Sequence, residues 1–166
     1  NIERSLANKL AILEALDAYL AGEPRVGKTG DAETDRLPRE ELLGDRVARA
    51  RETVAAARRR WQWLADSLDR PLASCAAELG ELGYGNLLEE ARRRAADPAA
   101  RIFDLLQDRT LRVSWKTEVR NELRRLFAGG PFAPLVADLE AIHRRVLRSR
   151  LFVALHMHAG DGNVHT

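Results

Sequence analysis

Apolar residues recur in alternating steps of four and three along residues 43–68, and this spacing constrains the fold more than any other feature. Such spacing is the seam of a long helix, here predicted to open at Pro38, with seam residues Leu43, Val47, Ala50, Val54, Ala57, Trp61, Leu64 and Leu68. A second helix is predicted before Gly22 from the series Leu6, Leu10, Leu13, Leu16 and Leu20. The simplest arrangement packs these two helices antiparallel, although the same seam can also pair with a second copy of the chain.

Shorter helices are predicted along most of the remaining sequence, but two segments have a different pattern. In residues 110–116, apolar and polar residues alternate, which is typical of a half-buried strand. Residues 150–157 form an apolar run of strand length. The predicted class is therefore mainly α, an antiparallel helical hairpin or bundle with a small β element near 110–116 and 150–157, which makes the C-terminal end α+β.

The composition excludes several classes of protein. The 166 residues carry 27 basic and 25 acidic side chains, and this balance does not indicate a nucleic-acid-binding protein. No stretch approaches the roughly 20 apolar residues of a membrane span. The single cysteine, Cys75, excludes an intrachain disulfide and fits a reducing compartment, so a cytoplasmic location is expected.

Residues 22–29 match the letters of a phosphate-binding loop, G-x-x-x-x-G-K-[ST]. Such a loop works between a buried strand and a helix that opens at its Lys-Thr pair, because backbone amides and the helix dipole then converge on phosphate. Here a helix is predicted before the loop, and a polar, turn-prone stretch follows at residues 30–35. We therefore interpret the segment as an interhelical loop.

The C-terminal residues concentrate the groups that can carry chemistry. After the apolar run come His158, the turn-forming sequence Gly160-Asp161-Gly162-Asn163, and His165. A turn at residues 160–163 would bring His165 back towards His158, and two converging imidazoles suit zinc or a similar divalent ion. A hairpin turn that is merely flanked by histidines is an equal alternative on spacing alone.

Residues 158–165, His-Ala-Gly-Asp-Gly-Asn-Val-His, closely resemble the H-x-G-D-G-N-x-H signature of FAD-linked oxidases and dehydrogenases that act on 2-hydroxy acids. D-lactate dehydrogenases, the glycolate oxidase flavoprotein subunit and D-2-hydroxyglutarate dehydrogenases belong to this family. The resemblance implies that His158 and His165 belong to a divalent-metal site, with zinc favoured, which helps to bind and polarise the hydroxy acid near the flavin. It also implies that Gly160, Asp161, Gly162 and Asn163 form the active-site turn.

A shorter similarity lies upstream. Lys116-Thr117-Glu118-Val119 resembles the family's K-x-D-V segment, with Glu118 in place of Asp. In some members that lysine contacts the substrate carboxylate, so the resemblance implies a substrate-binding role for Lys116. Arg112 lies on the same face of the predicted strand and is expected to assist.

The family's FAD-binding domain has no counterpart in these residues, and neither does the later segment that supplies the remaining metal ligand and general base. We therefore expect a piece of a longer polypeptide, with residues 1–108 as a helical bundle or insertion and 109–166 as part of the substrate (cap) domain. The parent protein is expected to oxidise a 2-hydroxy acid by hydride transfer to FAD, and this chain alone is expected to be inactive. The alternative is a helical interaction or dimerisation module with an incidental histidine-rich tail.

Overall fold

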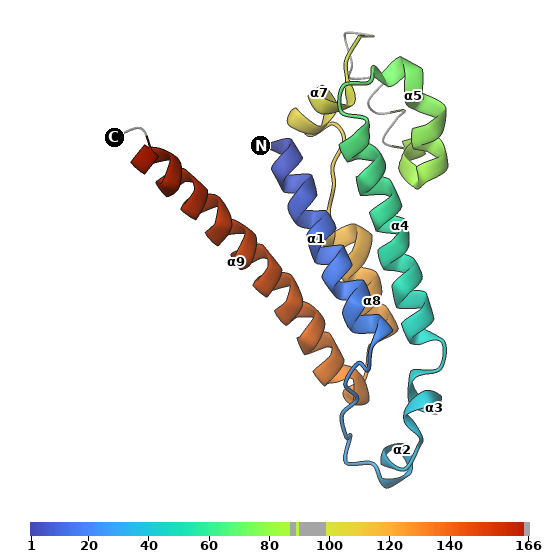
Figure 1. Cartoon of the computed structure of the whole chain (residues 1–166). Coiled ribbons are helices and arrows are strands. Elements are labelled where there is room, and N and C mark those ends of the chain that lie inside the picture. The colour runs from blue at the N-terminus through green and yellow to red at the C-terminus, as the bar shows by residue number, and fades with distance from the viewer. Residues whose placement is uncertain (87–88, 90–98, 165–166) are drawn as a thin grey trace.

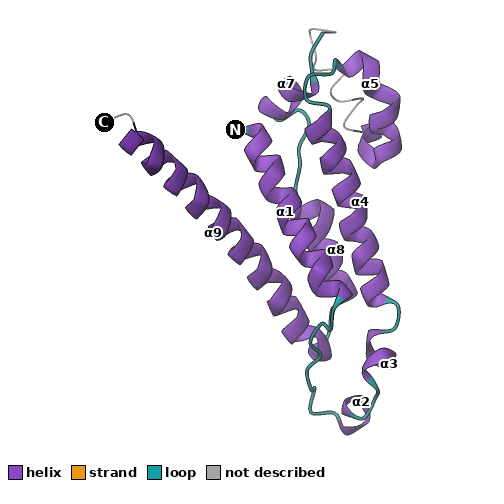
Figure 2. Cartoon of the chain, in the orientation of Figure 1, coloured by secondary structure: helices purple, strands orange, loops and turns teal. Residues whose placement is uncertain are grey.

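The computed structural model describes the backbone of residues 1–86, 89 and 99–164, and the side chains of these residues up to residue 150 (Figure 1). The predicted mainly helical class is confirmed, and Figure 2 draws the described elements as helices joined by loops. In chain order these are α1 (Ile2–Ala21), α2 (Ala32–Asp35), α3 (Arg39–Leu43), α4 (Arg46–Asp66), α5 (Leu72–Leu79), the π-helical turn η1 (Gly80–Tyr84), α7 (Ile102–Gln107), the π-helical turn η2 (Lys116–Arg120), α8 (Asn121–Leu126), the 3-10 turn η3 (Gly130–Phe132) and α9 (Ala133–Val164).

Helices α1 and α4 run antiparallel, and their pairing confirms the predicted hairpin (Figure 1). The α1 helix begins where the Asn1 side chain accepts a hydrogen bond from the Glu3 backbone N–H at 2.9 Å, which satisfies one free amide of the first turn. The apolar faces that meet are fully buried, and they include Leu13 and Leu16 of α1 and Ala50, Val54, Ala57, Trp61 and Leu64 of α4. The heptad seam is thus covered within a single chain.

The long helix predicted from Pro38 is interrupted at Gly44, which separates α3 from α4. Gly44 has φ +52, in the region that favours glycine because a Cβ atom would clash with the backbone. Leu43 still reaches the core ahead of this break. The apolar spacing therefore identified the buried residues correctly but did not detect the break in the backbone.

Two connected clusters of apolar side chains form the core. The larger one combines α1 and α4 with η2, α8 and the first half of α9, through residues such as Val119, Phe127 and Leu135. The second cluster lies at the other end of α4 and includes Leu68, Leu79, Ile102 and Leu105. Residues from both sides of position 108 contribute to the larger cluster, and the domain division at that position remains a prediction.

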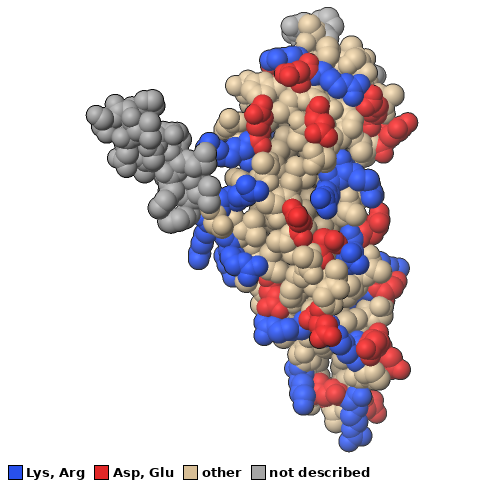
Figure 3. All heavy atoms as spheres, in the orientation of Figure 1, with Lys and Arg blue, Asp and Glu red and all other residues tan. Residues whose placement is uncertain are grey.

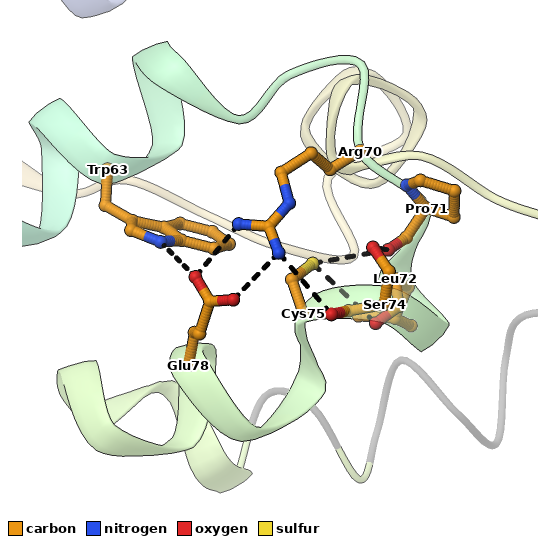
Figure 4. A network of polar contacts seen from close by, with 7 residues as sticks. All are labelled: Trp63, Arg70, Pro71, Leu72, Ser74, Cys75 and Glu78. Carbon is orange, nitrogen blue, oxygen red and sulfur yellow. Dashed lines mark hydrogen bonds and ion pairs between the residues drawn. The ribbon is translucent and has the colours of Figure 1, made fainter.

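A polar network fastens α5 to the end of α4 (Figure 4). The Glu78 carboxylate accepts hydrogen bonds from Arg70 at 2.7 Å and from the Trp63 indole N–H at 2.9 Å. These hydrogen bonds, that of Arg70 first, lower the pKa of Glu78 to about 2. Cys75 lies buried beside the network, its thiol donating to the Pro71 carbonyl at 3.3 Å, and burial raises the pKa of this thiol. It is therefore a packed cysteine and not a reactive one.

Neither strand of the predicted small β element is present in the described residues. Residues 111–114 form a loop that leads into a helical turn, and residues 150–157 belong to α9. The β pairing found in the described part of the chain is an isolated bridge between Pro71 and Arg101. A strand is stabilised by pairing with a neighbour, so an alternating segment without a neighbouring strand has nothing to pair with.

Ser114 explains why a helix starts where a strand was predicted. Its hydroxyl accepts a hydrogen bond from the Thr117 backbone N–H at 3.1 Å, while the Glu118 carboxylate accepts one from the Ser114 N–H at 2.9 Å. This reciprocal arrangement caps a helix N-terminus. The cap was a signal in the sequence that the alternation of Leu111, Val113 and Trp115 concealed.

No helix in the described part of the chain has both the length and the apolar character needed to cross a membrane.

The α1–α4 interface gives the first prediction. Replacing the fully buried Trp61 by Ala is expected to lower the free energy of unfolding by about 3–5 kcal/mol, because it leaves a large cavity in the seam. Urea denaturation followed by circular dichroism measures this. Leu37→Ala is the control, since Leu37 is 44% exposed and its loss should change stability by at most about 0.5 kcal/mol. Equal effects of the two substitutions would contradict the described core.

Candidate functional site

The signature segment lies at the C-terminal end of α9. The backbone is helical through Val164, so the turn predicted at residues 160–163 is not present in this structure. The side chains of residues 151–164, His158 among them, lie outside the described part, and so does the whole of His165. A short apolar run cannot by its spacing alone be assigned to strand or helix, and Leu, Ala and Met favour helix intrinsically.

The predicted metal ligands, His158 and His165, lie outside the described side chains, so the metal site remains a prediction. No group of three or more His, Cys, Asp or Glu side chains suitable for an ion occurs among the described residues. In a helix, positions seven apart are separated by about 10.5 Å along the axis, whereas zinc–nitrogen bonds are about 2 Å long. A helical segment therefore does not fit a shared ion at positions 158 and 165.

Arg112 and Lys116 are not on a common strand face. Arg112 lies in the loop before η2, where its Nε donates to the Arg109 carbonyl at 3.2 Å, and Lys116 is an exposed residue at the start of η2. Arg112 lines a surface pocket of about 440 Å³ together with Lys9 and Arg109, whereas Lys116 does not. The two predicted substrate-binding residues therefore do not share a pocket.

Glu118, which stands where the family segment has Asp, joins three parts of the fold. Its carboxylate accepts hydrogen bonds from Arg60 of α4 at 2.8 Å and from the Tyr84 hydroxyl of η1 at 3.0 Å, besides the Ser114 N–H. Burial, followed by the negative charge of Glu118, raises the pKa of Tyr84. The position has a structural role in this chain, one that the resemblance did not indicate.

A second pocket lies where η2 and α8 meet α9. It is lined by Trp115, Arg120, Arg124, Glu140, His143 and Arg144, which come from two segments separated by 16 positions between Arg124 and Glu140. The rings of Trp115 and His143 are stacked, with centroids 4.6 Å apart and planes 13° from parallel. His143 is thus packed against Trp115. The convergence of the arginines was not visible in the sequence.

The phosphate-loop letters at residues 22–29 belong to an interhelical loop, as interpreted. The backbone amides of Thr29 and Gly30 donate to the Asp35 carboxylate at 2.8 and 3.1 Å, and the Gly27 amide donates to the Pro131 carbonyl at 2.7 Å. These amides are already satisfied, and the next helix, α2, begins only at Ala32. The geometry that binds a nucleotide phosphate is absent from this described loop.

No family model, no curated protein and no solved structure matches this chain.

The Glu118 contacts give the second prediction. Glu118→Gln removes the charge that balances Arg60 in a site where the two side chains are only 14% and 19% exposed. The expected loss of unfolding free energy is about 1–3 kcal/mol, since a partly buried charge is left without its partner. Glu52→Gln is the matched control, because the Glu52–Arg59 pair is 71% and 61% exposed and should contribute at most about 0.5 kcal/mol. Chemical denaturation of both variants tests the difference, and a neutral Glu118→Gln would contradict the structural role.

Proposed function

We propose that this chain is part of an FAD-linked dehydrogenase or oxidase of 2-hydroxy acids, with residues 158–165 in the substrate site. The observation that carries the proposal is the eight-residue match to the H-x-G-D-G-N-x-H signature. The match includes both histidines, both glycines and the Asp-Gly-Asn core, a combination that chance rarely produces. D-lactate, glycolate and D-2-hydroxyglutarate represent the proposed substrate class.

The arrangement of α9 supports a role for the segment outside the bundle. Among the described side chains of α9, which end at residue 150, Ile142 is the last buried one, and Figure 1 shows the helix separating from α1 towards its C-terminal end. Leu147, further along, is 37% exposed. The C-terminal part of α9 thus leads away from α1, where a neighbouring domain can contact it.

Local preferences oppose a helix in this segment. Glycine destabilises a helix interior by about 1 kcal/mol relative to alanine, and Gly160 and Gly162 both lie in the helical backbone. Contacts with a neighbouring flavin domain are then sufficient to convert residues 160–163 into the turn that the proposed site needs. FAD would accept the hydride in such a site, and the proposal assigns ion binding to His158 and His165.

Lys116 and Arg112 are the residues proposed to contact the substrate carboxylate. Lys116 and Arg112 are both exposed and can contact a carboxylate, but they do so from separate surfaces. Arg112, beside Lys9 and Arg109, is the better supported of the two. The alternative function, an interaction module that uses the α4 seam, has less support because α1 already covers that seam.

The third prediction tests the substrate site in the full-length native protein that the proposal requires. Anaerobic bleaching of the flavin absorbance by D-lactate, glycolate or D-2-hydroxyglutarate reports hydride transfer. His158→Ala and His165→Ala should each slow this bleaching at least about 100-fold, since even residues behind the metal ligands typically contribute 10–100-fold. His143→Gln, a histidine outside the signature, should leave the rate unchanged. A native protein without flavin would overturn the proposal.

The fourth prediction concerns the backbone of the signature. Replacing Gly160 and Gly162 together by Ala should favour the helical form by about 2 kcal/mol, measured as an increase in helical circular dichroism of this chain. The same double change should abolish substrate-dependent flavin bleaching in the full-length protein, because the turn can no longer form. Ser149→Ala, an exposed change in α9 before the signature, is the control and should leave bleaching intact. Full activity of the double variant would show that no turn is needed.

A further inference from the structure

Three arginines line the pocket between η2, α8 and α9, and of these Arg124 alone has an ion pair with a described acidic residue. The pocket measures about 250 Å³, whereas a water molecule occupies about 30 Å³ of liquid, so a small molecule fits inside. Its lining consists of Trp115, Arg120, Arg124, Glu140, His143 and Arg144. In Figure 3, Lys and Arg side chains also gather over the part of α9 that lies beside α1.

Arg120 is the most informative residue of this pocket. Its Nε is buried and has no hydrogen-bond partner among the described residues. A buried donor that is left unsatisfied costs about 1–3 kcal/mol, and more when it belongs to a charged group. Native proteins rarely tolerate such a donor without a bound water or ion. Arg144, which is exposed, likewise has no ion pair or hydrogen bond with any described residue.

The one acidic residue of the pocket is already engaged. Glu140 accepts from Arg124 Nε at 3.1 Å and also from a terminal nitrogen of the same guanidinium, which fixes the position of Arg124. Three arginines and one glutamate leave two uncompensated positive charges, three minus one, when His143 is neutral. The charge of the pocket therefore matches a doubly charged anion.

Trp115 and His143, whose rings are stacked on each other, both line the pocket. Burial, followed by the positive charges of Arg120 and Arg144, lowers the pKa of His143. Lys9 of α1 acts in the same direction, and Glu140 opposes it. The imidazole thus experiences a positive potential that the protein's own acids do not cancel, and it still offers one N–H donor when neutral.

We propose that this pocket binds the phosphate group of a small molecule as a dianion, with Arg120 and Arg144 contacting its oxygens. Guanidinium groups present paired N–H donors that match the spacing of phosphate oxygens. The Trp115 ring offers a face against which an adjoining flat group of the ligand can pack. The site is built from described residues alone and does not depend on the proposed flavin chemistry.

A phosphate is favoured over a monocarboxylate because one negative charge would leave the pocket still positive. It is favoured over a dicarboxylate because Arg120 and Arg144 line the same pocket of about 250 Å³, where both charges of a phosphate lie on one group. The Arg120 guanidinium lines the pocket and has no ion pair with a described acidic residue, so a phosphate oxygen would give it a charge-assisted hydrogen bond. These three features assign the ligand class.

The fifth prediction uses the 166-residue chain, inorganic phosphate and sulfate, with chloride at matched ionic strength as the reference. Sulfate remains doubly charged throughout the titration of His143. Saturating sulfate should raise the pKa of His143, measured by NMR, by at least about one unit, because a nearby opposite charge favours the protonated imidazole. Phosphate should bind at a single saturable site by calorimetry. Absence of a saturable effect from both anions would overturn the proposal.

Two variants and a control locate the effect. Arg120→Gln should abolish the sulfate-induced shift, and Arg144→Gln, which changes an exposed residue and keeps the core, should reduce phosphate affinity about tenfold or more. Arg148→Gln removes an exposed charge of the same helix that does not line the pocket, and it should behave as wild type. Equal losses in Arg148→Gln and Arg144→Gln would indicate general screening and refute the site. Tighter binding of succinate than of phosphate would refute the assigned ligand class.

Discussion

The burial of α1 is the constraint on which the rest of the structure depends. Its apolar residues contact α4 on one side and α9 on another. Without α1, each of these two long helices would expose an apolar face to water. Leu13 and Leu16 are completely buried as a result. The Arg25–Asp138 ion pair, together with the Tyr19 hydroxyl donating to Asp138 at 2.5 Å, fixes α9 against the end of α1. The geometry of the second pocket follows, because α9 carries His143 and Arg144 to their places.

The sequence predicted the helical class and the pairing of α1 with α4, since apolar spacing reports which residues are buried. It did not predict the helix break and the helix start that depend on single residues. Gly44 breaks the long helix through a positive φ, and Ser114 with Glu118 starts a helix inside an alternating segment. In both places the apolar residues remained on the buried side, and only the backbone conformation differed. The spacing of apolar residues indicates which side chains are buried, whereas individual hydrogen bonds determine where a helix begins and ends.

The signature segment presents a competition between two backbone forms. The backbone of α9 is helical through Val164. This part of the helix includes Gly160 and Gly162, and glycine destabilises a helix interior. A turn at residues 160–163 would suit the conformational freedom of the glycines, but the described part of the chain contains no strand that could pair with the residues beside it. The two glycines together lower the stability of the helical form by about 2 kcal/mol relative to alanines at the same positions. A sequence match to a functional motif therefore identifies chemistry more directly than it identifies the conformation of a segment outside its site.

The arginine-lined pocket follows from how this chain distributes its charges. Many of its arginines are matched locally, as Arg51 is by Asp17 and Arg70 by Glu78. Residues 141–150 contain four arginines and no acidic residue, and the neighbouring Arg120 lacks a carboxylate within ion-pair distance among the described residues. No motif marks this site, because its residues come from segments that only the packing of α9 against η2 and α8 brings together. Arg120 and Arg144, which line one pocket without an ion pair to any described acidic residue, maintain a positive electrostatic potential there that a bound anion would neutralise.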